Sequence, residues 1–283
     1  MPTLRRKTII SHHARVAELD RLVRECDANR IIPIVSPLST TYRVFSDNAD
    51  SLVTSLEDLQ NQTIKLWQDN RQAEVDEAHI EIIRLLHNFL AAAKTLVDHT
   101  RVVVQTLYNS THPFRVEYDE RKDLQFKYSE LSHFVHDLRN YALHRRIPVT
   151  NATLTVAPAR DRLISTVCLS VDSLRQWDGW SKTTKLYLQN LRDKLPLLYV
   201  MEPYKELVSE FNSWMVNRIK EIHAKEFREV DKYRTDRNDF FFFLKSTQVQ
   251  KGCGSTYRWQ RRLSSQQTAR LPFVVKFNVK TNG

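Results

Sequence analysis

Apolar side chains recur every three or four residues over most of the chain, which predicts a succession of helices. The longest such pattern covers about residues 74 to 108 and corresponds to a helix of roughly 50 Å at 1.5 Å per residue. Shorter patterns predict further helices at about 4–29, 47–70, 119–146, 181–194 and 203–238. A proline-marked connector, 31–37, should separate the first two helices, and the polar cluster 109–113 should end the longest one.

The pattern changes to alternation after Pro148. Residues 149–156 and 163–169 are expected to form a β-hairpin, and 240–244 and 271–279 to form short strands. Only 4 glycines among 283 residues favour helices over turn-rich β structure. We therefore predict a mainly α fold, a helical bundle of long helices with an inserted β-hairpin and a small C-terminal β and basic appendage.

Three segments follow from this organisation. They are an N-terminal helix and connector (1–46), the helical bundle with the hairpin at about 149–169 (47–240) and a basic C-terminal appendage (241–283). The net charge is +10, and the segment from Lys251 onward holds seven Lys or Arg and no Asp or Glu. Such an excess indicates an acidic partner such as nucleic acid.

The cysteines and the hydropathy pattern bear on location. Cys26, Cys168 and Cys253 are too widely spaced for a disulfide framework or a zinc site, which fits a reducing cytoplasm. The N-terminus is basic but has no apolar signal core, and no apolar run approaches the roughly 18 residues of a membrane span. We expect a cytoplasmic protein that does not enter the membrane.

The predicted helix 119–146 carries two faces near its C-terminal end. The apolar face consists of Leu131, Phe134, Leu138 and Tyr141 or Ala142. The polar face consists of His133, Asp137, Asn140 and His144. Pro148 stops the helix soon after His144, so the polar face should end where a ligand can reach it.

Arg139, Asn140 and His144 form the most suggestive motif on this face. The spacing resembles the signature of the HEPN family (higher eukaryotes and prokaryotes nucleotide-binding domains), which is Arg, four to six residues and His, often with Asn directly after the Arg. Arg6 with His12 or His13 and Arg218 with His223 have similar spacing but lack the Asn. The order of a long helix followed by the motif helix also resembles that family, whereas the hairpin would be an insertion.

The resemblance implies a metal-independent endoribonuclease that needs no cofactor. A 2′-hydroxyl that attacks the adjacent phosphodiester needs a group that exchanges protons near neutral pH, and His144 has that range. Arg139 would bind the charged phosphoryl oxygens, and Asn140 would orient the imidazole or bind phosphate. Five residues on a helix correspond to about 140° of rotation, so Arg139 and His144 diverge within one protomer. A homodimer with facing motif helices, assembled through Phe134, Tyr141 and the long helix, would bring them together.

Other residues are candidates for RNA binding. These are His136, Arg145 and Arg146 near the helix end, and Arg258, Arg261 and Arg262 among aromatic residues of the basic tail. Arg145 and Arg146 are equally suited to interacting with the helix dipole, and the tail to being a solvated segment. His133, His136 and Asp137 have helical spacing for metal binding, but a polar face is the simpler interpretation, and we expect no metal site.

Three functions therefore stand open. The first is an HEPN-type ribonuclease, a toxin or antiviral-defence effector with an antitoxin or defence-system partner. The second is a catalytically inactive module of the same fold that binds RNA or a nucleotide. The third is a structural or regulatory dimerisation component.

Overall fold

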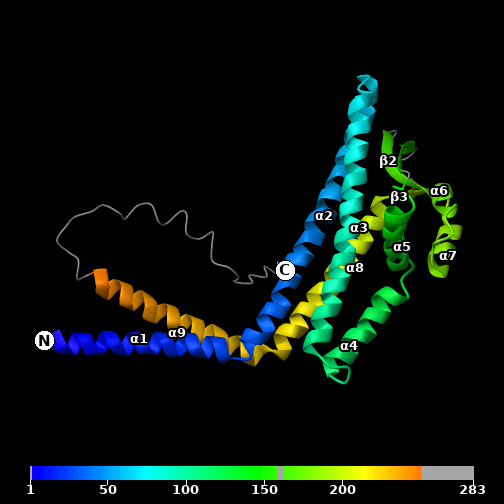
Figure 1. Cartoon of the computed structure of the whole chain (residues 1–283). Coiled ribbons are helices and arrows are strands. Elements are labelled where there is room, and N and C mark those ends of the chain that lie inside the picture. Colours follow the sequence, from blue (N-terminus) through cyan, green and yellow to red (C-terminus); the bar gives the residue numbers. More distant parts are fainter. Residues whose placement is uncertain (1, 149, 158–161, 250–283) are drawn as a thin grey trace. The chain divides into compact units, whose positions relative to one another are not determined.

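The computed structural model describes the backbone of residues 2–148, 150–157 and 162–249, and it confirms a mainly helical fold with a β-hairpin (Figure 1). The elements in chain order are α1 (Pro2–Glu25), α2 (Ala28–Gln68), α3 (Gln72–Leu107), α4 (Pro113–Lys122), the π-helical turn η1 (Asp123–Lys127), α5 (Glu130–His144), β1 (Thr150–Ala157), β2 (Arg162–Ser170), α6 (Val171–Arg175), α7 (Lys182–Asn190), β3 (Lys194–Pro196), α8 (Leu198–Ile222) and α9 (Ala224–Val249). The predicted helix 74–108 and the turn that follows it are confirmed by α3 and by the start of α4 at Pro113, but α2, with 41 residues against 36, is longer than α3. None of the helices in these ranges is long and apolar enough to cross a bilayer.

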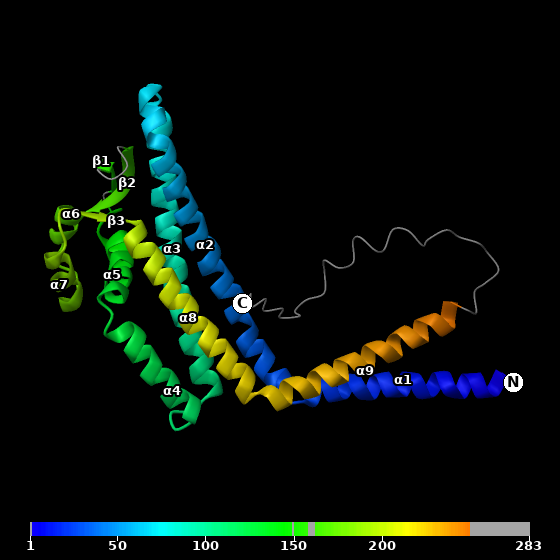
Figure 2. The same cartoon turned by 180° about the vertical axis from the view of Figure 1, so that it is seen from behind.

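The chain divides into two compact units, residues 1–39 with 218–283 and residues 40–217. In the first unit α1 and α9 lie side by side (Figures 1 and 2). Leu19 and Val230 are buried there, and Arg237 forms an ion pair with Asp20 at 3.2 Å. This division differs from the three consecutive segments expected from the sequence, because it groups the two ends of the chain.

The core of the second unit lies between α2, α3 and α8. The rings of Phe45 on α2, Phe89 on α3 and Tyr204 on α8 meet there, and all three are buried. The Phe45 and Phe89 ring centroids are 5.5 Å apart, and those of Phe89 and Tyr204 are 6.0 Å apart. Both views show α2 and α3 running side by side (Figures 1 and 2). These three helices form the scaffold for α5, which packs on α3.

The predicted connector 31–37 is wrong, because α2 runs through it with Pro33 and Pro37 inside the helix. Each proline removes one backbone hydrogen bond. The two prolines are four residues apart and therefore lie on the same side of the helix, where both are exposed. Water can solvate the carbonyl groups left unpaired on that side, while the opposite side buries Leu38. The chain turns instead at Cys26 and Asp27.

The predicted single helix 119–146 is also divided. It consists of the end of α4, the π-helical turn η1, a break at Tyr128 and Ser129, and α5. The Ser129 side chain accepts a hydrogen bond from the backbone N–H of Ser132 at 3.2 Å and so caps the new helix. The motif residues therefore belong to a short helix of their own.

Towards the C-terminus, the pattern at 203–238 spans two helices, α8 and α9, which meet at His223. The expected strand 240–244 is wrong, because these residues continue α9. The expected strand 271–279 lies outside the described residues.

The predicted hairpin is confirmed by β1 and β2, which pair antiparallel with Thr150 opposite Leu169. The sequence pattern did not reveal α6 or β3, which pairs with β2 and completes the sheet order β1-β2-β3. The predicted helix 181–194 ends at Asn190, where α7 ends. His79 Nε2 on α3 lies 2.5 Å from Thr150 Oγ1, so the hairpin begins against the long helix.

Candidate functional site

The apolar face of α5 fixes this helix in the core. Phe134, Leu138 and Tyr141 are at most 1% exposed, which confirms the predicted face. The Tyr141 ring stacks on Trp180 with centroids 5.3 Å apart and an interplanar angle of 8°. Trp177 packs edge-on against Tyr141. Both tryptophans lie between α6 and α7, so the segment that follows the hairpin in sequence supplies part of the packing that holds the motif helix.

Asp137 does not belong to the exposed polar face predicted for it. Its side chain is buried, and it accepts hydrogen bonds from the Ser181 backbone N–H at 3.0 Å and the Thr184 hydroxyl at 2.7 Å. Burial opposes ionisation, but the hydrogen bonds from His136, Ser181 and Thr184 outweigh it and hold the pKa of the Asp137 carboxyl well below its usual range. Asp137 thus anchors the start of α7 to α5.

Arg139 projects from α5 toward α3. Its Nη1 donates to Asn140 Oδ1 at 3.3 Å, while its buried Nε has no hydrogen-bond partner within the described part of the chain. No Asp or Glu of the described residues forms an ion pair with it. Arg139 lines a small hollow of about 20 Å³ together with Lys94 and His136. A partly buried guanidinium without an acidic partner is unusual and suits an anionic ligand.

Asp98, an acidic group that the charge of Arg139 influences, already forms ion pairs with other cations. Asp98 on α3 forms an ion pair with Lys94 and another with Arg101. The hydrogen bond from Lys94, with smaller contributions from the charges of Arg101 and Arg139, lowers the pKa of the Asp98 carboxyl. Asp98 thus has two ion pairs with other cations, and the charge of Arg139 acts on it only from beyond ion-pair distance, so the local balance of charge stays positive.

His144 occupies a different side of α5. It is the last residue of the helix and is exposed, and no hydrogen bond joins it to Arg139 or Asn140 among the described residues. The five-residue separation corresponds to about 7.5 Å along the axis and 140° around it. The structure therefore brings Arg139 and Asn140 together but leaves His144 apart.

The other predicted RNA-binding residues divide in the same way. Arg146 Nε donates to the Tyr141 hydroxyl at 2.8 Å and its Nη2 contacts Ser173, so this side chain ties the end of α5 to α6. Arg145 and His136 are exposed. The tail residues Arg258, Arg261 and Arg262 lie outside the described residues.

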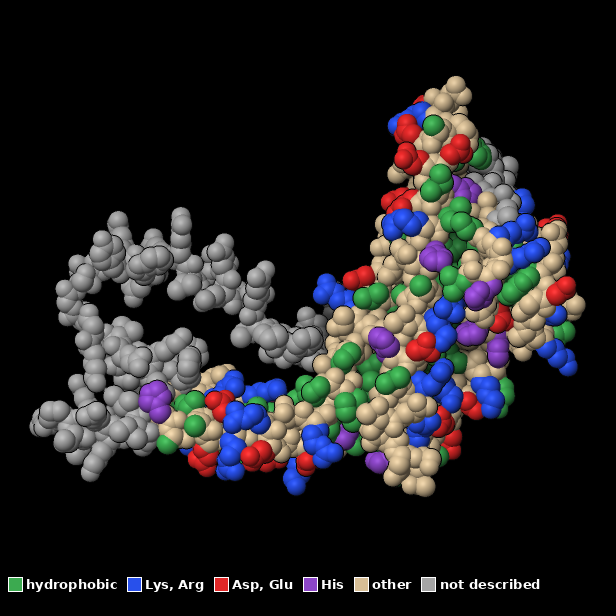
Figure 3. All heavy atoms as spheres, viewed as in Figure 1, with side chains coloured by type: hydrophobic (Ala, Val, Ile, Leu, Met, Phe, Trp, Pro, Cys, Tyr) green, Lys and Arg blue, Asp and Glu red, His purple; other side chains and the backbone are tan. Residues whose placement is uncertain are grey.

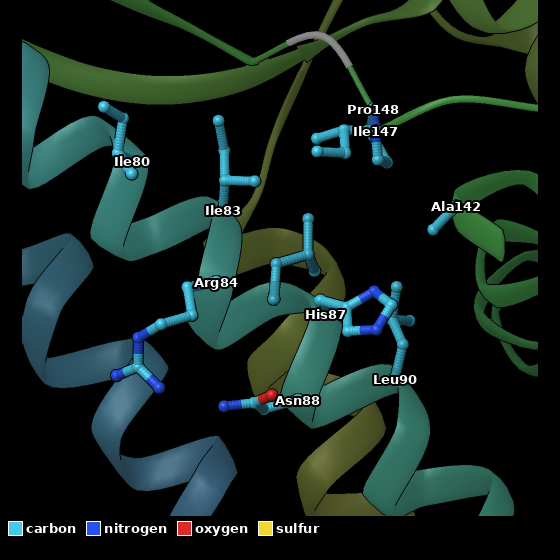
Figure 4. A pocket seen from close by; sticks show the side chains of 10 residues that line it. Ile80, Ile83, Arg84, His87, Asn88, Leu90, Ala142, Ile147 and Pro148 are labelled. Carbon is cyan, nitrogen blue, oxygen red and sulfur yellow. The ribbon is translucent and has the colours of Figure 1, made fainter.

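A cavity that was not predicted from the sequence lies between α3 and α5, as the hollow beside Arg139 does. Its volume is about 400 Å³, and it shares Leu90 with the hollow beside Arg139. It is lined by Ile83 and His87 on α3, by Ala142 near the end of α5, and by Ile147 and Pro148, which follow α5 (Figure 4). Histidine, lysine and arginine side chains gather over α3 and α5 on this face (Figure 3). A signal for the cavity in the sequence is Ile80, an apolar residue that lies off the buried face of α3.

The alternative metal site at the start of α5 is not assembled. His133 Nε2 lies 2.8 Å from the Lys127 carbonyl oxygen, and the Asp137 carboxylate bonds α7. Within the described ranges, no group of three or more His, Cys, Asp or Glu side chains is placed to hold a metal ion. Comparison of the chain with family models, curated proteins and solved structures gave no match.

Proposed function

We propose that this protein is a metal-independent endoribonuclease of the HEPN type. The observation that carries the proposal is Arg139, a partly buried guanidinium without an acidic partner among the described residues, beside Asn140 and Lys94. Such an arginine is preorganised for a phosphate, because α5 is fixed by buried aromatic rings and need not reorder when RNA binds.

In this mechanism Arg139 binds the scissile phosphate and stabilises the charge of its pentavalent transition state. Asn140 keeps the guanidinium in position through the Nη1 to Oδ1 hydrogen bond. His144 exchanges protons with the attacking 2′-hydroxyl or the leaving 5′-oxygen. The products are a 2′,3′-cyclic phosphate and a 5′-hydroxyl, so the reaction needs no water in this step.

A homodimer completes the site in this proposal. Arg139 of one protomer and His144 of its partner would meet at one phosphate, since the two side chains diverge on a single α5. Phe134 and Tyr141 cannot form the contact expected of them, because both are buried within the protomer. Leu143 and Val97, which are 45% and 42% exposed, are the available apolar residues beside Arg139. The cellular role would be that of a toxin or defence effector, with an antitoxin or defence-system protein as partner.

The divergence of Arg139 and His144 also favours a second candidate. A monomer would retain the phosphate-binding arginine without the general acid or base, and would act as a silent module that binds RNA or a nucleotide. A third role, a dimerisation component, would use the same exposed apolar residues without RNA.

Incubation of the purified protein with a labelled RNA panel in EDTA separates these functions. The ribonuclease leaves 2′,3′-cyclic phosphate ends, and His144→Ala abolishes the products. Binding without products identifies the silent module. If the protein neither binds nor cleaves RNA, the dimerisation component is the remaining candidate.

A further inference from the structure

The cavity between α3 and the end of α5 has a consistent chemical character. Ile83, Ile147 and Pro148 form apolar walls, and Ile80 and Ile147 remain 66% and 59% exposed at its edge. His87 extends from α3 toward Ala142 and places an imidazole ring beside these walls (Figure 4). Its volume of about 400 Å³ lies within the range of ligand pockets, roughly 300 to 1,000 Å³.

The polar residues at the edge exclude a phosphate as the group inside the cavity. Arg84 is bound to Glu81, with Nε donating to Oε2 at 2.6 Å, so its charge is already balanced. Arg84 and Asn88 extend from the side of α3 that faces away from Pro148 (Figure 4). Apart from His87, Arg84 and Asn88, the side chains that line the cavity are apolar, which suits a flat ring with hydrogen-bonding atoms on its edge.

The position of the cavity relative to Arg139 indicates which kind of ring would bind in it. The cavity contacts α3 from Ile80 to Leu90, and the hollow beside Arg139 contacts it from Leu90 to Val97. The cavity and the hollow thus follow one another along α3, separated by about one or two helical turns of 5.4 Å each. A nucleotide offers this pairing, an anionic phosphate next to a flat, largely apolar base.

We propose that this cavity binds one unpaired nucleobase of an RNA strand whose phosphate lies at Arg139. The inference rests on the proposed function, because it places the same RNA strand between α3 and α5. The base lies between the isoleucine side chains and stacks on His87. The site therefore selects single-stranded RNA, because a base in a duplex stays stacked on its neighbours and cannot enter.

The test measures binding, so that it does not depend on cleavage. A fluorescein-labelled 2′-O-methyl hexanucleotide, which lacks the attacking hydroxyl, is compared with the same strand carrying abasic residues. Fluorescence anisotropy in EDTA gives both affinities, and adenosine monophosphate serves as a competitor. Ala142→Phe fills the cavity, and Ile147→Ser removes one wall. Val102→Ser is the matched control, because Val102 is 58% exposed on α3 and lies outside both spaces.

We expect the wild type to bind the base-bearing strand about tenfold more tightly than the abasic strand. Ile147→Ser and Ala142→Phe should remove most of that ratio, and Val102→Ser should keep it. Equal affinities, a ratio unchanged in Ile147→Ser, or displacement by adenosine monophosphate without a strand preference would overturn the proposal. The proposal would also be overturned if Ile147→Ser abolished a dimer in sedimentation but kept the ratio of the two strand affinities. The cavity would then be a contact with a second protomer. If the two strands bind equally well but RNA is still cleaved, only the base-binding subsite is contradicted. If the base-bearing strand binds tenfold more tightly but no RNA is cleaved, only the ribonuclease activity is contradicted.

Discussion

The carboxylate of Asp137 on α5 accepts a hydrogen bond from the Thr184 hydroxyl on α7 at 2.7 Å. The same oxygen accepts the backbone N–H of Ser181, the N-cap residue of α7. Asp137, which lies two residues before Arg139 in α5, thus accepts hydrogen bonds from two donors at the start of α7. The orientation of the motif helix therefore depends on a contact that takes no part in the proposed chemistry.

Replacing Asp137 by alanine should destabilise the protein by about 3 kcal/mol. Two buried donors, the Ser181 N–H and the Thr184 hydroxyl, lose their acceptor in that variant. Urea unfolding followed by circular dichroism measures the change. Asp172→Ala is the control, because the Asp172 side chain is 64% exposed and its ion pair with Arg175 contributes less than about 1 kcal/mol. Equal losses in the two variants would contradict the role given to Asp137.

The stability supplied by Asp137 should also depend on pH. Because the folded state lowers the pKa of this carboxyl, its contribution is complete above the unfolded pKa of about 3.9 and is lost as the pH falls toward the folded value. Wild type and Asp137→Asn should therefore differ by a constant free energy of unfolding between about pH 5 and 7. The difference should shrink below about pH 4. Thermal melts from pH 2 to 7 test this, and a difference independent of pH would show that the carboxylate is not the source.

Local patterns in the sequence were sufficient for α3 and for the hairpin. In α3 the buried residues recur on one side over the whole length, so the helical period is unmistakable. Pro33 and Pro37 misled the prediction, because proline usually ends a helix, whereas here both face solvent. The segment 240–244 misled it through its run of aromatic residues, which favours strands but occurs here within α9.

Contacts between distant segments account for what the sequence could not reveal at the site. Asp137 looked exposed by helical spacing, but its partner Ser181 lies 44 residues away. The Arg146 side chain is likewise held by a distant residue, because its Nη2 donates a hydrogen bond to Ser173. The cavity beside Ile147 exists only because the end of α5 meets α3. The motif itself could be found from the sequence, because Arg139, Asn140 and His144 are close neighbours in the chain.

Arg139→Ala should reduce RNA cleavage by roughly 10²- to 10³-fold, because it removes the group that stabilises the charged phosphoryl oxygens. Arg139→Lys should recover only a small part, since an ammonium cannot bind two oxygens in a fork and cannot reproduce the hydrogen bond to Asn140 Oδ1 with the same geometry. Initial rates in EDTA measure both. Arg43→Ala serves as the control, because this side chain is 82% exposed on α2. Full activity of the lysine variant would assign Arg139 a purely electrostatic role.

Removing residues 250–283 should weaken RNA binding most at low salt. The segment carries seven Lys or Arg and no Asp or Glu, and each phosphate contact releases counterions. The slope of log affinity against log salt should become shallower in the truncated protein. Replacing Arg258, Arg261 and Arg262 by glutamine in the full chain provides the matched variant. An unchanged affinity and salt slope in both would identify the segment as a solvated tail.

Mixing an Arg139→Ala protein with a His144→Ala protein should restore cleavage that neither shows alone. In a two-fold dimer with shared sites, one site of the mixed dimer carries both defects, and the other pairs the intact Arg139 with the intact His144. Random exchange makes about half of the dimers mixed, and each has one working site in two. The expected activity is therefore about a quarter of the wild-type value.

The control for the mixing experiment is a double variant, Arg139→Ala with His144→Ala, combined with either single variant. No site in that mixture can contain both residues, so cleavage should stay absent. Mass photometry before and after mixing establishes that dimers form and exchange. If exchanging dimers regain no activity, each protomer works alone, and Arg139 and His144 do not act on the same phosphate across the interface. A protein that is monomeric at micromolar concentration would have the same consequence, because the 140° between these residues on α5 then cannot be closed by a partner.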